Sequence, residues 1–505
     1  MTRKLWHKKR ICDIQRKGKS LGCSMGPKAK NASRKSSRRL KVERQVTAQQ
    51  VDSKLPKKLF LETVGIDRSK LIHDAVKKVL WEVGAIYEHV PTQQRLINDY
   101  GCREIDGERI QIPPDLVDKV LSTLPRQIKL FDLDGHERVD TSSKTPSFCP
   151  GHNCVQILDY KTDNLRPALL EDIRSTARLC DALPNIDVVC SLGYPSEVAP
   201  ENEVTECTRA MYENSTKPAA LLAHDEFIQE RMMKIVADIA GGWNRIAEKP
   251  VSIELMGPVS PLKLPAELCV RLTNCARWRA PVVCYPATFP GMSSPISIAG
   301  AIVQSSAEAI AGILIHQLEE PGAPVMSGSA ILPMDLRQAN LAYGSPEYML
   351  SGLGASEYLN FAGIPTWVGG GCSDSHQFDA QAAAEAGANL AIAGLANASF
   401  VHNLGFLSGG RTGSLELLTL CDEMIGWTSK MANGLEINPE TLAVEVIQRA
   451  APNNEFLTDR HTQDRFLTEN WYPKLSERSD SQAWQEAGAQ DMRTRIKQKI
   501  DDIVH

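Results

Sequence analysis

From about residue 150 onwards, short apolar runs alternate with longer stretches whose apolar residues recur at helical spacing. The short runs are rich in β-branched residues and predict strands whose starts lie about 30 to 40 residues apart. They occupy residues 155–158, 186–192, 219–223, 251–256, 281–285, 324–326, 364–368 and 399–401. The longer stretches predict helices over residues 169–183, 203–214, 226–241, 262–279, 296–318, 346–361, 380–396 and 414–431.

Eight strand–helix units in about 280 residues are what a closed (β/α)8 barrel, the TIM barrel, requires. A doubly wound open sheet is the rival architecture, but it normally uses fewer strands. We therefore predict an α/β fold with a catalytic (β/α)8 barrel over residues 151–431. The first unit has a second interpretation, because residues 155–160 could instead form a strand of a preceding domain.

The flanks of the barrel have different patterns. Residues 59–150 combine helical spacing with short extended pieces, which predicts a small N-terminal α+β cap. Residues 432–505 predict a C-terminal helical extension that ends in a charged amphipathic helix. Residues 1–50 are rich in Lys, Arg, Ser and Gly and poor in large aliphatic residues, so they predict a disordered arm.

Charge is divided unevenly along the chain. Residues 1–44 carry 16 Lys and Arg against Asp13 and Glu43, whereas the rest of the chain is acidic. One interpretation is an arm that binds nucleic acid or an anionic surface. We favour a solvated tail or an upstream extension of the reading frame, because Met25 would also serve as a start. A nucleic-acid partner is therefore not expected.

Cysteine usage and hydropathy bear on the compartment. The chain has 13 cysteines without any Cys-x-x-Cys pair, and its first residues are charged with no apolar signal segment. Reduced, buried thiols in a cytoplasmic protein are expected. The longest apolar stretch, residues 298–318, contains polar and charged residues, so no membrane span is predicted. The sequence leaves homo-oligomer formation open.

The stretch from residue 363 to 413 contains the strongest candidates for chemistry. It is predicted as strand, glycine-rich polar loop, helix, strand and glycine-rich loop, which is typical of an enzyme site at the carboxyl ends of parallel strands. Asp374, His376 and His402 are the candidate catalytic residues. The barrel frame brings further residues to the same mouth, and we expect these to bind substrate: Glu254, Tyr285, Phe289, Gly328, Asp335, Arg337, Tyr343, Trp367 and Asn403.

Two other kinds of site are weighed against this one. The glycines 369–371 lack the spacing of a phosphate-binding loop, so a nucleotide site is not expected. Two histidines and a carboxylate could hold iron or zinc. However, Asp374 and His376 are only two residues apart on a loop, without a ligand helix, so we predict no metal.

Several motifs in their order along the chain resemble the trimethylamine methyltransferase family. They are Gly257-Pro-Val-Ser-Pro-Leu, Pro321-Gly-Ala-Pro-Val-Met-Ser-Gly, Pro333-Met-Asp-Leu-Arg with Tyr343-Gly-Ser-Pro-Glu, and Gly370-Gly-Cys-Ser-Asp-Ser-His-Gln-Phe-Asp-Ala-Gln. Upstream, Asp181-Ala-Leu-Pro-Asn-Ile-Asp and Thr216-Lys-Pro fit the same pattern, and downstream so do Val401-His-Asn and Asp422-Glu-Met-Ile-Gly. The resemblance covers about residues 59 to 435.

The resemblance implies a barrel that moves a methyl group from a methylated amine to the Co(I) of a separate corrinoid protein. The chain itself is then expected to bind no cobalamin tightly. Trimethylamine enzymes of the family carry pyrrolysine, which is absent from this sequence. The chain therefore resembles the branch without pyrrolysine, which acts on quaternary amines such as glycine betaine. The family's usual Lys after Ser-Asp-Ser or Ser-Asp-Ala is His376 here.

A quaternary ammonium leaves as a neutral amine, so its demethylation needs orientation and a dry, cation-friendly pocket rather than a general acid. Aromatic side chains near the mouth, among them Tyr285, Tyr348 and Trp367, could supply that pocket. Carboxylates could add Coulomb attraction, and His376 or Arg337 could fix a substrate carboxylate. Taken singly, each aromatic residue is more readily explained as core packing, and the hypothesis is that several of them converge. A tertiary methylamine methyltransferase and an amine-binding barrel without transferase activity remain alternatives.

Overall fold

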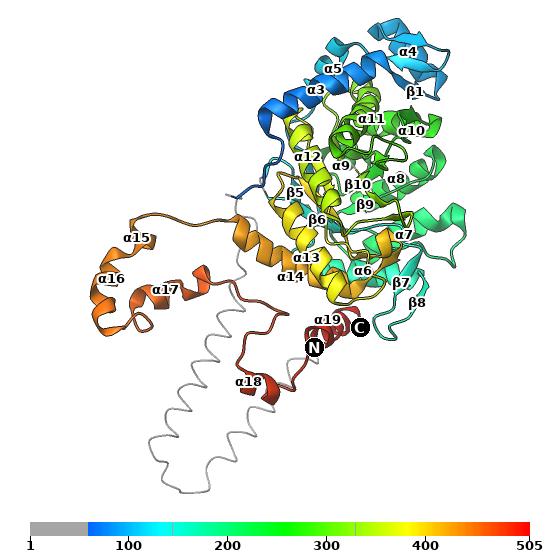
Figure 1. Ribbon diagram of the computed structural model, residues 1–505. Helices are drawn as coiled ribbons and strands as arrows, with labels where there is room; N and C mark the ends of the chain where they lie inside the picture. The colour runs from blue at the N-terminus through cyan, green and yellow to red at the C-terminus, as the bar shows by residue number, and fades with distance from the viewer. Residues whose placement is uncertain (1–58, 144, 329) are drawn as a thin grey trace, which may run out of the picture. The chain divides into compact units, whose positions relative to one another are not determined.

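The computed structural model of the protein describes residues 59–143, 145–328 and 330–505 (Figure 1). The predicted basic arm, residues 1–50, lies outside them. The chain divides into two compact units. Of the described residues, the larger contains 59–444 and Pro473–His505, and the smaller contains Glu445–Tyr472.

A parallel barrel forms the centre of the larger unit. Its strands are hydrogen-bonded, in the described part of the chain, in the order β6–β19–β18–β14–β12–β10–β9. The gap between β6 and β9 is bridged by residues 187–190, since Val188 N–H donates to Phe148 O and Val189 N–H donates to Pro218 O. The eight-fold barrel predicted from the sequence is thus confirmed. The strand bounds are β6 Ser147–Pro150, β9 Ala219–Leu221, β10 Ser252–Met256, β12 Val282–Cys284, β14 Val325–Gly328, β18 Thr366–Gly369 and β19 Phe400–Leu404.

The prediction for the first strand was wrong. The strand that pairs with β19 is β6, which precedes the predicted run at 155–158. That run contains β7 (Gln156–Leu158), which pairs antiparallel with β8 (Leu165–Pro167) and parallel with β21 (Thr412–Gly413) outside the barrel sheet. β6 is short, and Ser147 and Pro150 leave only Phe148 and Cys149 as apolar residues, so periodicity does not reveal it.

Helices alternate with the strands, as predicted. Side chains of Asp225, Ser297, Ser345, Asp379 and Ser414 cap their helices by accepting a backbone N–H in the first turn, which fixes where each loop ends. Figure 1 shows α11 to α14 side by side on one flank of the strands. The helices are α6 Leu170–Ala182, α7 Pro200–Asn214, α8 Glu226–Ala240, α10 Ala266–Trp278, α11 Ile298–Glu319, α12 Pro346–Phe361, α13 Ala380–Leu395 and α14 Leu415–Ala432.

Helix α11 is the one described helix long and apolar enough to cross a membrane. Of its most apolar window, 72% is buried within the protein. It packs against α10, α12 and the cap helix α3 (Gly65–Glu82). The burial explains its high apolar content, because a helix surrounded by protein has no polar face to maintain.

The N-terminal segment is joined to the barrel by a strand and by a helix. Strand β1 (Ala85–Tyr87) pairs parallel with β11 (Lys263–Leu264), which lies in the loop after β10. Helix α3 starts where the Glu357 carboxylate of α12 accepts the N–H groups of Val64 and Gly65. The other elements here are α4 Val90–Tyr100, β2 Arg103–Ile105, β3 Arg109–Gln111, α5 Pro114–Leu121, β4 Lys129–Phe131 and β5 Glu137–Asp140.

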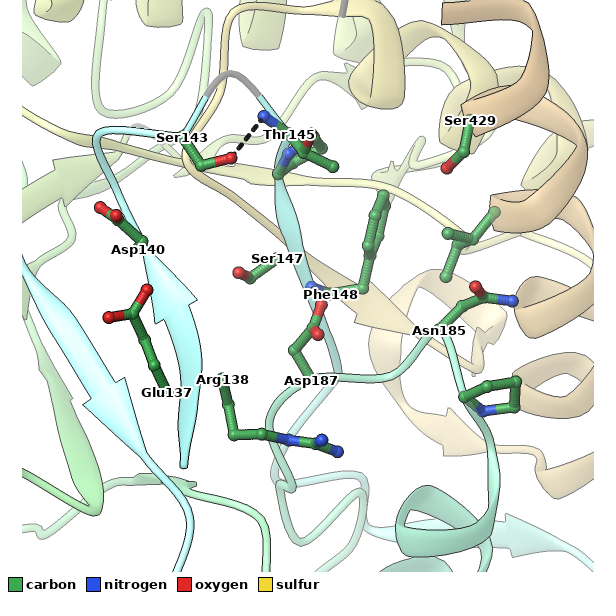
Figure 2. Close-up of a pocket in the computed structure, with 13 residues that line it drawn as sticks. Glu137, Arg138, Asp140, Ser143, Thr145, Ser147, Phe148, Asn185, Asp187 and Ser429 are labelled. Atoms are coloured by element: carbon green, nitrogen blue, oxygen red, sulfur yellow. Dashed lines mark hydrogen bonds between the residues drawn. The ribbon is translucent and has the colours of Figure 1, made fainter. Parts of the chain in front are cut away.

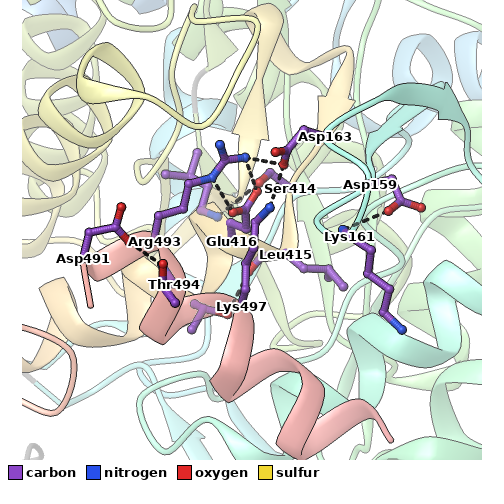
Figure 3. Close-up of polar contacts among 12 residues, drawn as sticks. Asp159, Lys161, Asp163, Ser414, Leu415, Glu416, Asp491, Arg493, Thr494 and Lys497 are labelled. Carbon is purple, nitrogen blue, oxygen red and sulfur yellow. Dashed lines mark hydrogen bonds and ion pairs between the residues drawn. The ribbon is translucent and has the colours of Figure 1, made fainter. Parts of the chain in front are cut away.

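The C-terminal helix α19 (Met492–Val504) packs on α14 and α6 of the barrel. Arg493 donates to Glu416 at 2.8 Å and to Asp163 at 2.6 Å, and Lys497 also donates to Asp163. Figure 3 shows these contacts. Glu416 is fully buried, so Arg493 is the counter-charge that makes this position tolerable. The other helices of residues 432–505 are α15 Pro439–Leu442, α16 Val444–Ala450, α17 Arg460–Glu469 and α18 Ser481–Glu486.

Candidate functional site

An aromatic cluster lies where the barrel strands end. The imidazole of His402 on β19 lies 5.1 Å from the ring of Tyr285 after β12, and 5.1 Å from the ring of Trp367 on β18. The ring of His152, just after β6, stacks on the His402 imidazole with centroids 6.4 Å apart. His402, Tyr285 and His152 thus converge near the carboxyl ends of three strands, where barrel enzymes carry their active sites. Trp367 is the second residue of β18 and lies in the barrel core, where its ring stacks on Phe400 at 4.6 Å.

His402 is an uncharged imidazole. Its Nδ1 lies 2.9 Å from the carbonyl oxygen of Val368, which can only accept, so Nδ1 donates the proton and Nε2 is an acceptor. Burial, with a smaller contribution from the nearby His152, lowers the pKa of His402 to about 3, although the hydrogen bond to Val368 opposes the shift. Burial likewise lowers the pKa of His152 to about 4. Neither ring repels a cation at neutral pH.

Two polar atoms of this cluster are buried without a hydrogen bond to any described residue. They are Nε1 of Trp367 and Nδ1 of His152. Buried polar atoms are nearly always satisfied in native proteins, so such exceptions mark places where a ligand or water completes the bonding. The cluster therefore has aromatic faces, neutral nitrogens and unmatched hydrogen-bonding groups in one place.

Asp374 does not face this cluster directly. Its carboxylate accepts the backbone N–H groups of Tyr343 at 2.8 Å and Gly344 at 2.9 Å. Burial raises the pKa of Asp374, and Glu385 adds to the rise, although the two N–H groups oppose it. Through these two hydrogen bonds Asp374 fixes the loop that carries Tyr343, and we call this pair of bonds the Asp374 latch.

Tyr343 connects that latch to the site. Its ring contacts the Tyr348 ring at 5.0 Å, and the Tyr348 hydroxyl accepts from Asn403 Nδ2 at 3.0 Å. Asn403 is adjacent to His402 in the chain. Position 328, next to Tyr285 and Trp367, has room only for glycine. A Cβ there would lie 1.9 Å from Trp367 O and 2.5 Å from the Tyr285 ring. The glycine lets Tyr285 pack at the end of β14.

Other predicted residues lie apart from the cluster. His376 is exposed, with Nδ1 2.8 Å from Ser408 Oγ. Asp335 and Arg337 pair with each other at 2.8 Å on a hairpin formed by β16 (Met334–Asp335) and β17 (Asn340–Leu341), and 86% of the Arg337 side chain is exposed. Phe289 is half-buried in the loop after β13 (Ala287–Thr288).

Glu254 is not brought to the mouth at all. Its carboxylate accepts from Arg271 Nη2 at 2.8 Å and from Gln229 Nε2 at 2.7 Å, and both partners lie on helices outside the barrel. The side chain therefore points away from the barrel axis. Alternation along β10 explains the error, because the neighbours Ile253 and Leu255 belong to the inner core.

Some residues at the mouth were missed by the sequence interpretation. His152 was overlooked because the first strand was placed after it, although an apolar pair followed by Pro150 and Gly151 was a usable signal. Tyr194 and Glu203 were also missed. Together with His152 and Leu255 they border a pocket between the second and third strands.

A larger cavity, about 220 Å³, lies elsewhere. It borders Ser147, the first residue of β6, and so marks the amino-terminal side of the barrel. Figure 2 shows Glu137, Asp140 and Arg138 around it, with Asp187 beside Phe148. Residues on this side of a barrel commonly serve stability rather than chemistry. Among the described residues, the one group placed to hold a metal is Asp132, Asp134 and His136, away from the aromatic cluster.

The fold and the site together define a (β/α)8-barrel protein with an aromatic, uncharged site at the carboxyl ends of its strands. The profile of the trimethylamine methyltransferase (MTTB) family matches residues 28–505. The chain belongs to this family of methyltransferases, which confirms the resemblance identified from its motifs.

Similar proteins extend over most of the chain. It is 27% identical to the trimethylamine methyltransferase MttB of Desulfitobacterium hafniense, covering 86% of this chain and 87% of that one. It is 28% identical to a glycine betaine methyltransferase of the same species, covering 83% and 87%. The monomethylamine methyltransferase MtmB of Methanosarcina barkeri is 11% identical with a TM-score of 0.51, covering 91% and 92%, and supports the fold alone.

Proposed function

We propose that this protein transfers a methyl group from a quaternary methylated amine of the betaine type to the Co(I) centre of a separate corrinoid protein. The observation that carries the proposal is the cluster of the half-buried Tyr285 and His152 with the buried Trp367 and His402 near the mouth of a barrel of this family. Aromatic faces attract a quaternary ammonium, each by about 0.5 to 2 kcal/mol.

The protonation state of the site fits a quaternary substrate. The C–N bond that breaks leaves its electron pair on nitrogen, and the methyl group bonds to cobalt, so a neutral tertiary amine departs without taking up a proton. His402, whose pKa burial lowers to about 3, is unsuited to donate one. The site needs only to orient the substrate and exclude water.

The acceptor belongs to another protein, so the site must be reachable from outside. The loops that carry Tyr343 and Asp374 follow β14 and β18, and Asp374 holds the first of them in place through its bonds to the N–H groups of Tyr343 and Gly344. We assign Asp374 a positioning role through Tyr343, and we assign Tyr285 and Trp367 to substrate binding. We also propose a cytoplasmic location, in which the described cysteines, all free and buried, would stay reduced.

The test is a panel of methylated amines incubated with the protein and a reduced corrinoid protein, with the demethylated products identified by mass spectrometry. Glycine betaine and related quaternary amines are expected to lose one methyl group, whereas trimethylamine should react at least tenfold more slowly. Equal turnover of trimethylamine would favour the tertiary-amine alternative. Binding of betaines without product would leave an amine-binding barrel.

A further inference from the structure

A second group of residues at the carboxyl ends of the strands is not explained by the aromatic cluster. It surrounds the pocket between the second and third strands and comprises His152, Tyr194, Glu203, Cys207, Met211 and Leu255. Leu255 belongs to the inner barrel core, whereas Glu203, Cys207 and Met211 lie on α7. The pocket therefore leads from the barrel axis outward to α7, and His152 links it to His402.

Glu203 is the only carboxylate in the lining of this pocket. Its side chain is half-buried and makes no ion pair or hydrogen bond with any residue of the described ranges. Burial alone raises the pKa of Glu203 to about 7. Burying a carboxylate without a counter-ion costs free energy. Glu254 differs in this respect, because Arg271 balances its charge.

The remaining walls suit an organic cation. The Tyr194 ring stands beside His224, with centroids 6.0 Å apart, and offers an aromatic face next to Glu203. Met211 and Leu255 are apolar, and the His152 ring is uncharged, with a buried Nδ1 that lacks a partner in the described part of the chain. Nothing in the lining carries a positive charge.

We infer that Glu203 is the counter-ion of the substrate's ammonium group, with Tyr194 as the aromatic face beside it and His152 as the link to the aromatic cluster. This deepens the proposed function and rests on it for the identity of the ligand, a quaternary ammonium. The space between these residues is about 30 Å³, smaller than a trimethylammonium head, so binding of this group requires the lining, which includes the half-buried Tyr194, to open.

The test measures binding of tetramethylammonium to the full chain by calorimetry, because this probe has a fixed charge and no carboxylate. Glu203→Gln is expected to weaken binding by about tenfold or more, which corresponds to about 1.4 kcal/mol. Glu201→Gln, an exposed carboxylate in the same turn of α7, should leave binding unchanged. Glu203→Asp keeps the charge and should retain most of the affinity.

The dependence on pH separates a counter-ion from a packing residue. Wild-type affinity should rise between about pH 6 and 8 as Glu203 loses its proton, and the Glu203→Gln variant should show no such rise. Equal affinity of the two folded proteins, or no binding of tetramethylammonium to the wild type, overturns the inference. Normal methyl transfer by Glu203→Gln would overturn it while the proposed function stands. Glu203-dependent binding without methyl transfer would retain the subsite and reject the function.

Discussion

The imidazole of His402 meets the ring of Tyr285 edge-on, with centroids 5.1 Å apart and planes at 84°. The two residues are separated by 117 positions in the sequence and come from β19 and the end of β12, which are not neighbours in the barrel. Their contact therefore crosses the mouth. In this arrangement the positive edge of one ring meets the negative face of the other, which stabilises the pair and fixes the orientation of both rings at the mouth.

The Tyr285 ring should contribute directly to affinity for the cation. Tyr285→Leu keeps an apolar side chain but removes the aromatic face, so binding of a quaternary amine should weaken by about 0.5 to 2 kcal/mol. Tyr285→Phe keeps the face and serves as the matched control. Calorimetric titration with glycine betaine checks both variants, and equal losses in the two would mean that the hydroxyl group, not the ring face, is responsible.

The latch at Asp374 should act on the site through Tyr343. Asp374→Ala removes two charge-assisted hydrogen bonds to the backbone, each worth about 1.5 to 3 kcal/mol, so the Tyr343 loop should loosen. We expect kcat/KM for methyl transfer to fall about 10- to 100-fold, with partial rescue in Asp374→Asn, which retains one acceptor. Asp134→Asn, an exposed carboxylate, is the control. A fall in Asp374→Ala without faster proteolysis of residues 333–344 would argue against the latch.

The end of β14 should not tolerate an added methyl group at Gly328. In Gly328→Ala the new Cβ would meet Trp367 O and the Tyr285 ring well inside contact distance, and backbone atoms cannot yield cheaply. The melting temperature and the activity should both fall. Gly352→Ala on α12 is the comparison, since no atom lies within 4 Å of its Cβ position, and alanine there should be neutral or stabilising by about 0.5 to 1 kcal/mol.

Buried neutral histidines should make the protein sensitive to acid. Burial lowers the pKa of both His402 and His316 to about 3, against about 6.5 in the unfolded chain. Below pH 6.5 the unfolded state binds protons that the folded state does not bind. The contribution of these histidines to the free energy of unfolding is therefore fully present above pH 6.5 and is lost as the pH falls towards 3. Each histidine should lower the free energy of unfolding by about 2 kcal/mol between pH 6.5 and 5.

Urea unfolding at pH 7 and pH 5 measures this loss. His316→Gln should show a loss smaller by about 2 kcal/mol than the wild type, because glutamine cannot take up the proton. His136→Gln, whose side chain is 76% exposed, should lose as much as the wild type. An unchanged loss in His316→Gln would contradict the account of buried neutral imidazoles.

Removal of Arg493 should show how much free energy is needed to bury the Glu416 carboxylate without its partner. Arg493→Ala leaves that carboxylate inside without its partner, so the free energy of unfolding should fall by about 3 to 5 kcal/mol. The double variant with Glu416→Gln should recover much of the loss, since the buried charge is then gone. Additive losses in the double variant would show that Arg493 acts mainly by packing.

The barrel was predictable from the sequence because seven of its strands are marked by apolar runs at regular spacing. The first strand was not, since Ser147 and Pro150 leave β6 only two apolar residues. That one error concealed His152. Convergence of Tyr285, Trp367 and His402 followed from strand order, whereas the outward orientation of Glu254 depended on a one-residue register that the pattern of an all-buried strand does not specify.

The roles of individual loop residues were harder to predict for a different reason. Asp374 was expected in the chemistry because a carboxylate in a glycine-rich loop often binds ligands, yet its oxygens are engaged by the N–H groups of Tyr343 and Gly344. That pairing joins two loops about 30 residues apart, and no local pattern encodes it. Glu203 resembled an ordinary first-turn acidic residue of a helix, and only its burial without a partner distinguishes it.

The most direct measurement is the absorbance of a reduced corrinoid protein after addition of this protein and glycine betaine labelled with deuterium in its methyl groups. The account predicts that the Co(I) spectrum disappears only when both are present, that a labelled methyl group is recovered on the corrinoid, and that Tyr285→Leu slows the change. An unaltered Co(I) spectrum with every quaternary amine, from a folded protein that binds them, would contradict it.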